Sequence, residues 1–152
     1  MGREVRMVPK DWKHPKDENG IYIPMHDESF IERHARWVSE FNDWQINPQS
    51  DCIFSEWGGP EPTKESYIPD WPQEQRTHCM MYETCTEGTP ISPAFETPEE
   101  LARWLSDNNA SAFGNQTASY DAWLRVAKGG YACSAVLSLE AGIITSGVEG
   151  LT

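Results

Sequence analysis

The sequence predicts an α+β fold. The expected domain is single, with an antiparallel sheet of about four strands from two hairpins and about three helices packed on one face. Residues 79–85 show a period of two, with Cys79, Met81, Glu83 and Cys85 on one face, and Glu87-Gly88 follows as a turn. Thr97-Pro98-Glu99-Glu100 combines an N-cap, a first-turn proline and a capping-box glutamate. The following order of two helices and a second hairpin completes the prediction.

Residues 1–26 are expected to form an N-terminal arm. Residues 3–7 alternate in polarity and predict a short strand. The stretch from Pro9 to Pro24 is rich in Pro, Lys and Asp, which indicates a loop with a turn at Asn19-Gly20.

An amphipathic helix is predicted over residues 27–45, with Asp27 as its N-cap. Ile31 and Val38 widen its apolar stripe, and a stripe of this kind more often packs in a core than binds a ligand. Residues on the opposite face indicate an ordinary solvated surface: Glu32, Arg36, Glu40 and Asp43. The stripe itself repeats at spacings of three and four residues: Phe30, His34, Trp37, Phe41 and Trp44.

Residues 46–76 form a long acidic segment rich in Pro and Trp. A connection of this length is unusual inside a compact domain. Its large apolar residues argue against plain disorder. Two alternatives follow: the segment wraps over the core, or it is a binding segment. The residues that would anchor it are Phe54, Trp57, Tyr67, Ile68 and Trp71.

Residues 77–152 are expected to form a hairpin-helix-helix-hairpin core. The return strand, Ile91 to Phe95, should be short or at an edge, because Pro90 and Pro93 lack a backbone donor. The helix that starts at Pro98 should end in the left-handed region at Asn108-Asn109.

The second helix of this core is capped by Thr117 or Ser119 and ends at Gly129-Gly130. A second hairpin should then follow, with strands at residues 131–139 and 143–148 and a turn at 140–142.

The charge of the chain is concentrated in its middle. The net charge is −12, and residues 27–100 alone hold four Lys/Arg against sixteen Asp/Glu. An acidic field of this kind repels nucleic acid and favours a partner with a basic surface. The plainer alternative is that the charge only keeps the protein in solution. Direct nucleic-acid binding is not expected.

No membrane segment and no metal site are expected. The sequence contains no run near the ~18 apolar residues of a membrane helix and no apolar signal sequence, so a cytoplasmic location is expected. In a reducing cytoplasm the four cysteines should be free thiols: Cys52, Cys79, Cys85 and Cys133. The nearest metal candidate, His78-Cys79 with Cys85, lacks zinc-site spacing, and an extended strand points His78 and Cys79 to opposite faces. No cofactor is predicted.

Few residues indicate catalysis. Phosphate-binding and nucleophile-elbow motifs are absent from the sequence. A small enzyme would have to use the Glu83-Cys85-Glu87 hairpin, either as a carboxylate pair or as a thiol with His78 as its base. The alternative is that these are ordinary surface and packing residues. We predict a chain that is not an enzyme and assign no catalytic residue.

Several long stretches of the sequence resemble a family of small proteins from tailed phages and prophages. The run YETCTEGTPISPAFETPEELARWLSDNNASAFG and the following TASYDAWL are the most distinctive. REVRMVPKDWKHPKDENGIYIPM and YIPDWPQEQRTH also fit shorter members. The family has no settled biochemical role, so the resemblance implies only a phage or prophage protein in the cytoplasm of a bacterial host. Some longer relatives carry C-x-x-C pairs, which this chain lacks, so no zinc role carries over.

Three functional hypotheses follow. The favoured one is a binding module that docks on a host protein, as a nucleic-acid mimic that inhibits a defence or nucleic-acid-processing enzyme. A small enzyme at the Glu83-Cys85-Glu87 hairpin and a structural or assembly accessory of the phage are the alternatives. An aromatic side chain among acidic neighbours suits a binding hot spot. The expected partner-binding residues are Glu56, Trp57, Glu61, Glu65 and Trp71.

Overall fold

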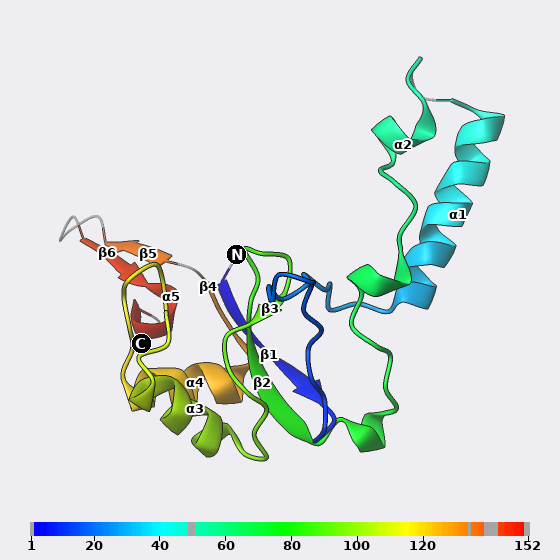
Figure 1. Ribbon diagram of the computed structural model, residues 1–152. Coiled ribbons are helices and arrows are strands. Elements are labelled where there is room, and N and C mark those ends of the chain that lie inside the picture. The colour runs from blue at the N-terminus through cyan, green and yellow to red at the C-terminus, as the bar shows by residue number, and fades with distance from the viewer. Residues whose placement is uncertain (1, 49–50, 134, 139–142, 151–152) are drawn as a thin grey trace. The chain divides into compact units, whose positions relative to one another are not determined.

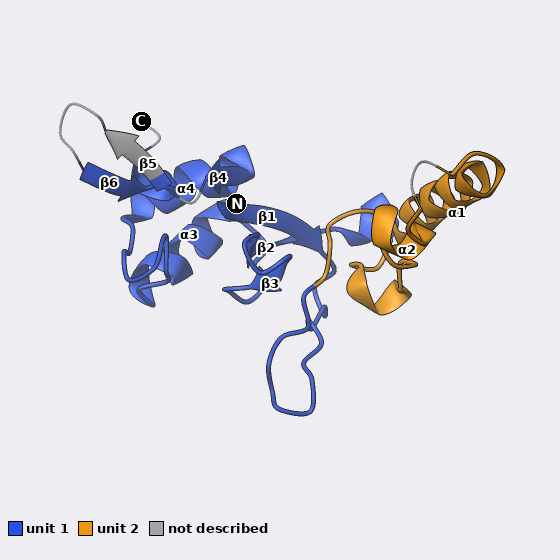
Figure 2. Ribbon diagram, turned by 90° about the horizontal axis from the view of Figure 1, so that it is seen from above, with its two compact units in different colours: residues 1–24, 71–152 blue, residues 25–70 orange. Residues whose placement is uncertain are grey.

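The computed structural model describes residues 2–48, 51–133, 135–138 and 143–150. The fold is α+β, as the sequence predicts. The chain divides into two compact units (Figure 2). Unit 1 comprises residues 1–24 and 71–152, and unit 2 comprises residues 25–70. That all 152 residues form a single domain stays a prediction.

The main sheet lies in unit 1 and is antiparallel, with the strand order β3-β2-β1-β4 (Figure 1). Its strands are β1 (Gly2–Val8), β2 (His78–Glu83), β3 (Thr89–Pro90) and β4 (Tyr131–Cys133).

The predicted four-stranded antiparallel sheet is confirmed, but it is not built from the two hairpins expected. The N-terminal strand β1 occupies a central position, where Val5 lies opposite Met81 of β2. Pairing between strands this far apart in the chain leaves no local pattern in the sequence, so it could not be read from alternation alone.

The second hairpin forms a separate two-stranded sheet of β5 (Ala135–Ser138) and β6 (Ile143–Ser146). The predicted strand over 131–139 is therefore divided between two sheets. The predicted strand over 143–148 was too long, because α5 (Gly147–Gly150) begins after Ser146. A Cβ at Gly147 would lie 1.9 Å from the Cys133 carbonyl oxygen, so this close approach requires glycine. The predicted turn at 140–142 lies outside the described residues.

The turn of the first hairpin agrees with its prediction, but the return strand does not: it is Thr89–Pro90, and residues 91–95, which include Pro93 with no backbone donor, form no strand. Glu87 and Gly88 both have positive φ, at 65° and 108°. Strand β3 is short and lies at the sheet edge, as expected from Pro90 and Pro93. The return run continues only as an isolated bridge between Cys79 and Phe95.

Two helices pack against the sheet in unit 1, α3 (Pro98–Asp107) and α4 (Tyr120–Gly129). The Thr97 cap of α3 and its end at Asn109, with φ of 51°, are confirmed. Ser119, one of the two predicted candidates, caps α4, and Gly130 ends it at φ of 87°.

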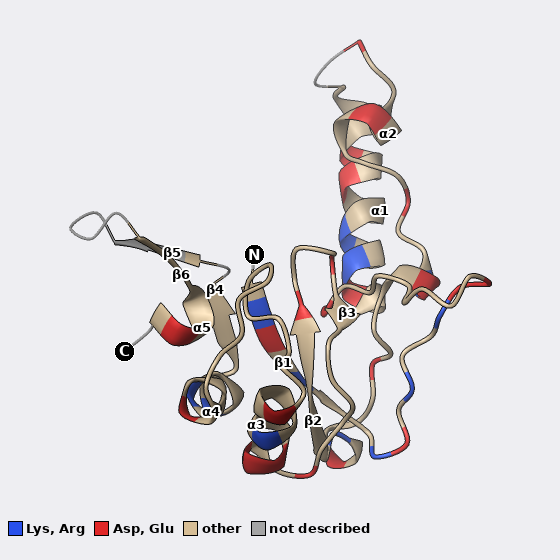
Figure 3. Cartoon of the chain, turned by 60° about the vertical axis from the view of Figure 1, so that its left-hand side comes forward, with Lys and Arg blue, Asp and Glu red and all other residues tan. Residues whose placement is uncertain are grey.

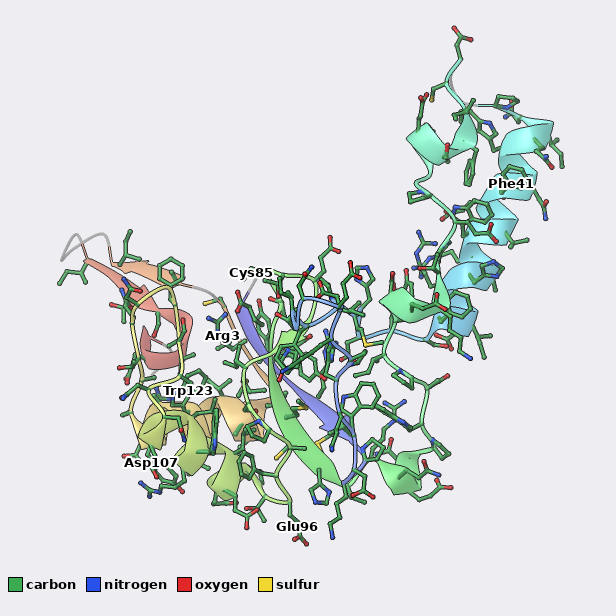
Figure 4. The ribbon with its side chains drawn as sticks, viewed as in Figure 1. Arg3, Phe41, Cys85, Glu96, Asp107 and Trp123 are labelled. Carbon is green, nitrogen blue, oxygen red and sulfur yellow. The ribbon has the colours of Figure 1, made fainter. Side chains whose placement is uncertain are left out.

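The core of unit 1 lies between these helices and one face of the sheet. Trp123 of α4 is fully buried within it (Figure 4). Burial of this much apolar and aromatic surface is the main stabilising contribution to the unit. The buried cluster comprises Cys79, Met81, Leu101, Ala102, Leu105, Ala112, Ala122, Trp123, Val126, Ala127, Ala132 and Val148.

Unit 2 is formed by α1 (Phe30–Ile46), α2 (Phe54–Trp57) and the chain around them. The N-cap of α1 is Ser29 and not the predicted Asp27, because the Ser29 hydroxyl accepts a hydrogen bond from the Glu32 amide. The two ends of the unit pair at His26. The His26 amide donates a hydrogen bond to the Ser66 carbonyl, and the His26 carbonyl accepts one from the Ile68 amide.

The predicted 46–76 segment is more regular than expected. It contains α2 and two short 3-10 helices, Lys64–Ser66 in unit 2 and Gln73–Gln75 in unit 1. Among the described residues, no helix is long and apolar enough to span a membrane.

Candidate functional site

The aromatic stripe of α1 packs on α2 within unit 2, as its spacing predicts. The Phe54 ring contacts Trp37 at 5.4 Å and Phe41 at 5.3 Å between ring centroids. The Trp37 indole also donates a hydrogen bond to the Gly59 carbonyl at 3.1 Å. These contacts hold α2 against the C-terminal half of α1.

An acidic and aromatic surface forms where α2 meets the end of α1. Trp57 is 50% exposed, and its ring centroid lies 5.0 Å from that of Trp44. We call this region the Trp57 surface. It surrounds a cavity of about 300 Å³ lined by Glu40, Asp43, Trp44, Asn47 and Trp57. Its exposed neighbours along the chain are Ile46, Ile53 and Glu56.

The Trp57 surface combines carboxylates with exposed apolar side chains. Ile46 is 85% exposed and Ile53 65% exposed. Acidic residues are distributed along α1 and α2 (Figure 3). Trp57, half-exposed beside the Glu40 and Asp43 carboxylates at this cavity, fits a binding surface.

The structure separates the five residues predicted to bind a partner. Glu56 and Trp57 lie together on α2. Glu61 bonds His34 of α1 at 2.8 Å, and Glu65 is exposed in the Lys64–Ser66 turn. Trp71 belongs to unit 1, where its ring packs edge-on against Trp12 with centroids 4.7 Å apart.

Sequence reasoning missed Glu40 and Asp43 as site residues. Both lie on the face of α1 that was interpreted as ordinary solvated surface. Only the packing of α2 brings Trp57 beside them, so no spacing within α1 could have revealed the cavity.

The Glu83-Cys85-Glu87 hairpin is unsuited to a thiol nucleophile. Burial raises the pKa of the Cys85 thiol, and the Glu83 carboxylate, which accepts its hydrogen bond, raises this pKa further. A nucleophilic cysteine needs the opposite shift. Arg3 lies at the same end of the sheet (Figure 4) and has a smaller, opposing effect on this pKa.

The base proposed for that thiol is too far away. His78 and Glu83 are the two ends of β2. At about 3.3 Å per residue their Cα atoms are roughly 16 Å apart. In the part of the chain that the structure describes, no three His, Cys, Asp or Glu side chains are grouped to hold a metal ion.

The second face of the sheet carries a buried polar network in unit 1. His14 Nε2 lies 2.5 Å from the Ile23 carbonyl oxygen and must donate to it, because a carbonyl only accepts. Burial lowers the pKa of His14; the Ile23 hydrogen bond opposes this shift and the Arg6 charge adds to it. The ring is therefore neutral near pH 7, so Nδ1 accepts from the Tyr82 hydroxyl at 3.0 Å.

The same Tyr82 oxygen accepts a hydrogen bond from the Trp12 indole at 3.1 Å. Arg6 lies over the Tyr82 ring, at 4.3 Å from its centroid, and binds Glu4 at 2.8 Å. The network fastens the loop after β1 to the sheet. Beside this loop lies a larger cavity, of about 850 Å³, that sequence reasoning did not predict.

No known protein family, curated protein or solved structure matches this chain. The sites described above are therefore the basis for inferring the function.

Proposed function

We propose that this chain is a small acidic binding module that docks on a partner protein through the Trp57 surface. The expected partner is a host protein with a basic surface, and the chain is a phage or prophage product that acts in the cytoplasm of a bacterial host. The observation that carries the proposal is the exposed Trp57 beside Glu40, Asp43 and the small cavity between them.

The distribution of charge supports a basic partner. Unit 2 has three Lys/Arg against ten Asp/Glu, a net charge of −7 in its 46 residues. Complementary charge accelerates encounter and excludes acidic competitors. Nucleic acid carries the same sign as this unit, so the proposal includes competition with nucleic acid for a basic groove.

The apolar residues contribute binding free energy that charge alone does not provide. Surface ion pairs contribute about 0–1 kcal/mol each, too little for stable docking. Hot spots are enriched in tryptophan that packs in a desolvated pocket. Trp57, half-exposed against Trp44 and beside Glu40 and Asp43, provides such an apolar centre with an acidic border.

A pull-down with the tagged protein from bacterial lysate, at low and high salt, tests the proposal. Wild type should capture one basic protein whose recovery falls at high salt. The variant Glu40→Lys/Asp43→Lys should lose most of this capture. Trp57→Ala should reduce it about tenfold, the size expected for an aromatic hot spot. Added DNA should displace the captured protein.

The matched control is Glu96→Lys/Asp107→Lys, which changes the same charge at exposed positions of unit 1 (Figure 4). This control should capture the partner as wild type does. If the control lost as much capture, the loss would depend only on the net charge of the protein and not on the Trp57 surface. If Glu40→Lys/Asp43→Lys captured the partner as well as wild type does, the partner would not bind at the Trp57 surface.

A further inference from the structure

The cavity beside the sheet in unit 1 is lined by groups that attract an anion. The loop that follows β1 contributes Lys10, Lys13 and Lys16. These are three of the twelve Lys and Arg residues of a chain with 24 Asp and Glu. The full described lining contains no carboxylate: Lys10, Trp12, Lys13, His14, Lys16, Tyr22, Met80, Pro90, Ile91, Ser92, Pro93, Ala94 and Trp104.

The lysines are available to a ligand. All three side chains belong to exposed residues, and among the described residues none forms an ion pair with a carboxylate. Lys16 Nζ lies 4.7 Å from the centroid of the Tyr22 ring. The wall of the cavity therefore presents a cation beside an aromatic face.

One acidic group of the loop, Asp17, is engaged in the turn that follows Lys16. The Asp17 carboxylate accepts hydrogen bonds from the Asn19 and Ile21 amides, at 2.8 and 3.0 Å. It lines a separate, smaller cavity and closes the loop turn. Asp11 and Glu18 also belong to this loop, and none of its three carboxylates lines the cavity of the lysines.

The remaining wall is largely apolar. Trp104 and Tyr22 present aromatic surface, and Met80, Pro90 and Ile91 supply aliphatic surface. The volume, about 850 Å³, falls within the usual range for small-molecule sites, roughly 300–1,000 Å³. A ligand that fits this lining carries several negative charges next to a planar ring.

The site is also held in place before any ligand arrives. His14 and Trp12 both bond the buried Tyr82 hydroxyl, which fixes the loop between the lysines. Both ring nitrogens of His14 are used in this way, so His14 is a positioning residue and has no proton to exchange with a ligand.

We propose that this cavity binds a nucleoside phosphate, with Lys10, Lys13 and Lys16 at its phosphates and the aromatic wall at its base. Ammonium groups bind phosphate as point charges. Bases stack on aromatic side chains whatever their sequence. A long nucleic acid is disfavoured, because unit 1 as a whole holds nine Lys/Arg against fourteen Asp/Glu.

Isothermal titration calorimetry of the full chain with ATP, GTP, CTP and UTP, in EDTA, tests the proposal. At least one should bind with one-to-one stoichiometry and more weakly as the salt rises to about 0.15 M. Absence of binding by all four up to millimolar concentration would overturn it. A single-stranded oligonucleotide that bound more tightly than every nucleotide would overturn it in favour of a nucleic-acid site.

Matched variants locate the binding. Lys10→Gln/Lys13→Gln/Lys16→Gln should raise the Kd at least tenfold, and the single change Lys13→Glu should act in the same direction. The control removes three cations outside the cavity: Arg36→Gln, Lys64→Gln and Lys128→Gln. The control should bind as wild type does. Equal weakening in both triple variants would show that only long-range charge matters and would overturn the assigned site.

The contribution of the base is tested separately with inorganic tripolyphosphate. It should bind at least tenfold more weakly than the preferred nucleotide. Tyr22→Leu should weaken the nucleotide several-fold and leave tripolyphosphate unchanged. Tripolyphosphate that bound as tightly as the nucleotide would remove the base from the proposal.

Discussion

At the scale of single residues, Trp12, His14 and Tyr82 of unit 1 match their polar groups to one another. Tyr82 is fully buried, and its hydroxyl accepts a hydrogen bond from the Trp12 indole and donates one to His14. A buried hydroxyl without partners would cost about 1–3 kcal/mol, so this network is part of what stabilises the loop over the sheet. It also makes stability depend on the protonation of one imidazole.

We expect the free energy of unfolding to fall below neutral pH through His14. Its pKa in the folded state lies below the ordinary 6.5 that applies when the chain unfolds. Between these two values the unfolded chain binds more protons, so stability is complete above about pH 6.5 and declines as the pH falls. Urea unfolding of wild type and His14→Gln at several pH values measures this.

His14→Gln should be less stable than wild type by about 1–3 kcal/mol at pH 7.5, because the hydrogen bonds fit less well. The stability gap should narrow as the pH falls toward 5. A gap that stays constant over this range would show that His14 does not titrate in the predicted window.

Cys85 should react slowly with iodoacetamide at pH 7.5, more slowly than free cysteine. Burial and Glu83 both raise the pKa of this thiol, so little thiolate is present. Glu83→Gln should accelerate the reaction and Glu87→Gln should not. Peptide-resolved mass spectrometry separates Cys85 from the other three cysteines. Faster alkylation than free cysteine would restore the enzyme hypothesis at this hairpin.

At the scale of secondary-structure elements, helix ends follow local rules and strand partners do not. The caps at Thr97 and Ser119 each accept one amide hydrogen bond from three residues ahead. Strand β1 instead depends on β2, more than 70 residues along the chain. Substitutions at caps should therefore have predictable, local costs.

Ser119→Ala should lower the free energy of unfolding by about 1 kcal/mol, because the Ala122 amide loses its partner at 3.2 Å. Thr117→Ala is the matched control, since Thr117 is exposed and does not cap α4. Its change should stay within about 0.5 kcal/mol. Equal costs at both positions, measured by urea denaturation, would contradict the assigned cap.

At the scale of the whole molecule, the excess of negative charge opposes compactness. The net charge is −12, and more than half of it belongs to the 46 residues of unit 2. Like charges repel over a distance of about 10 Å at 0.1 M salt. Screening should therefore stabilise the folded chain.

Raising NaCl from about 0.01 M to 0.15 M should increase the Tm by a few degrees, because the repulsion is screened. Differential scanning calorimetry measures the shift. Glu40→Lys/Asp43→Lys, which reduces the charge of unit 2, should show a smaller shift. A Tm that falls with salt would indicate that attractive surface pairs outweigh repulsion.

Local sequence is enough to predict the α+β class, the caps of α3 and α4, the Glu87-Gly88 turn and the aromatic stripe of α1. Each depends on residues within a few positions of one another, where backbone preference and side-chain periodicity act directly. The N-cap of α1 was assigned to Asp27 and not Ser29, because two acceptable caps stood close together.

The pairing of strands, and therefore the set of residues that meet at each site, depends on the three-dimensional fold. The central place of β1 puts its following loop, with Lys10, Lys13 and Lys16, beside a cavity of unit 1. The return of α2 onto α1 puts Trp57 beside Glu40 and Asp43. These juxtapositions arise from burial of apolar surface between distant segments, and such burial leaves no fixed spacing in a sequence.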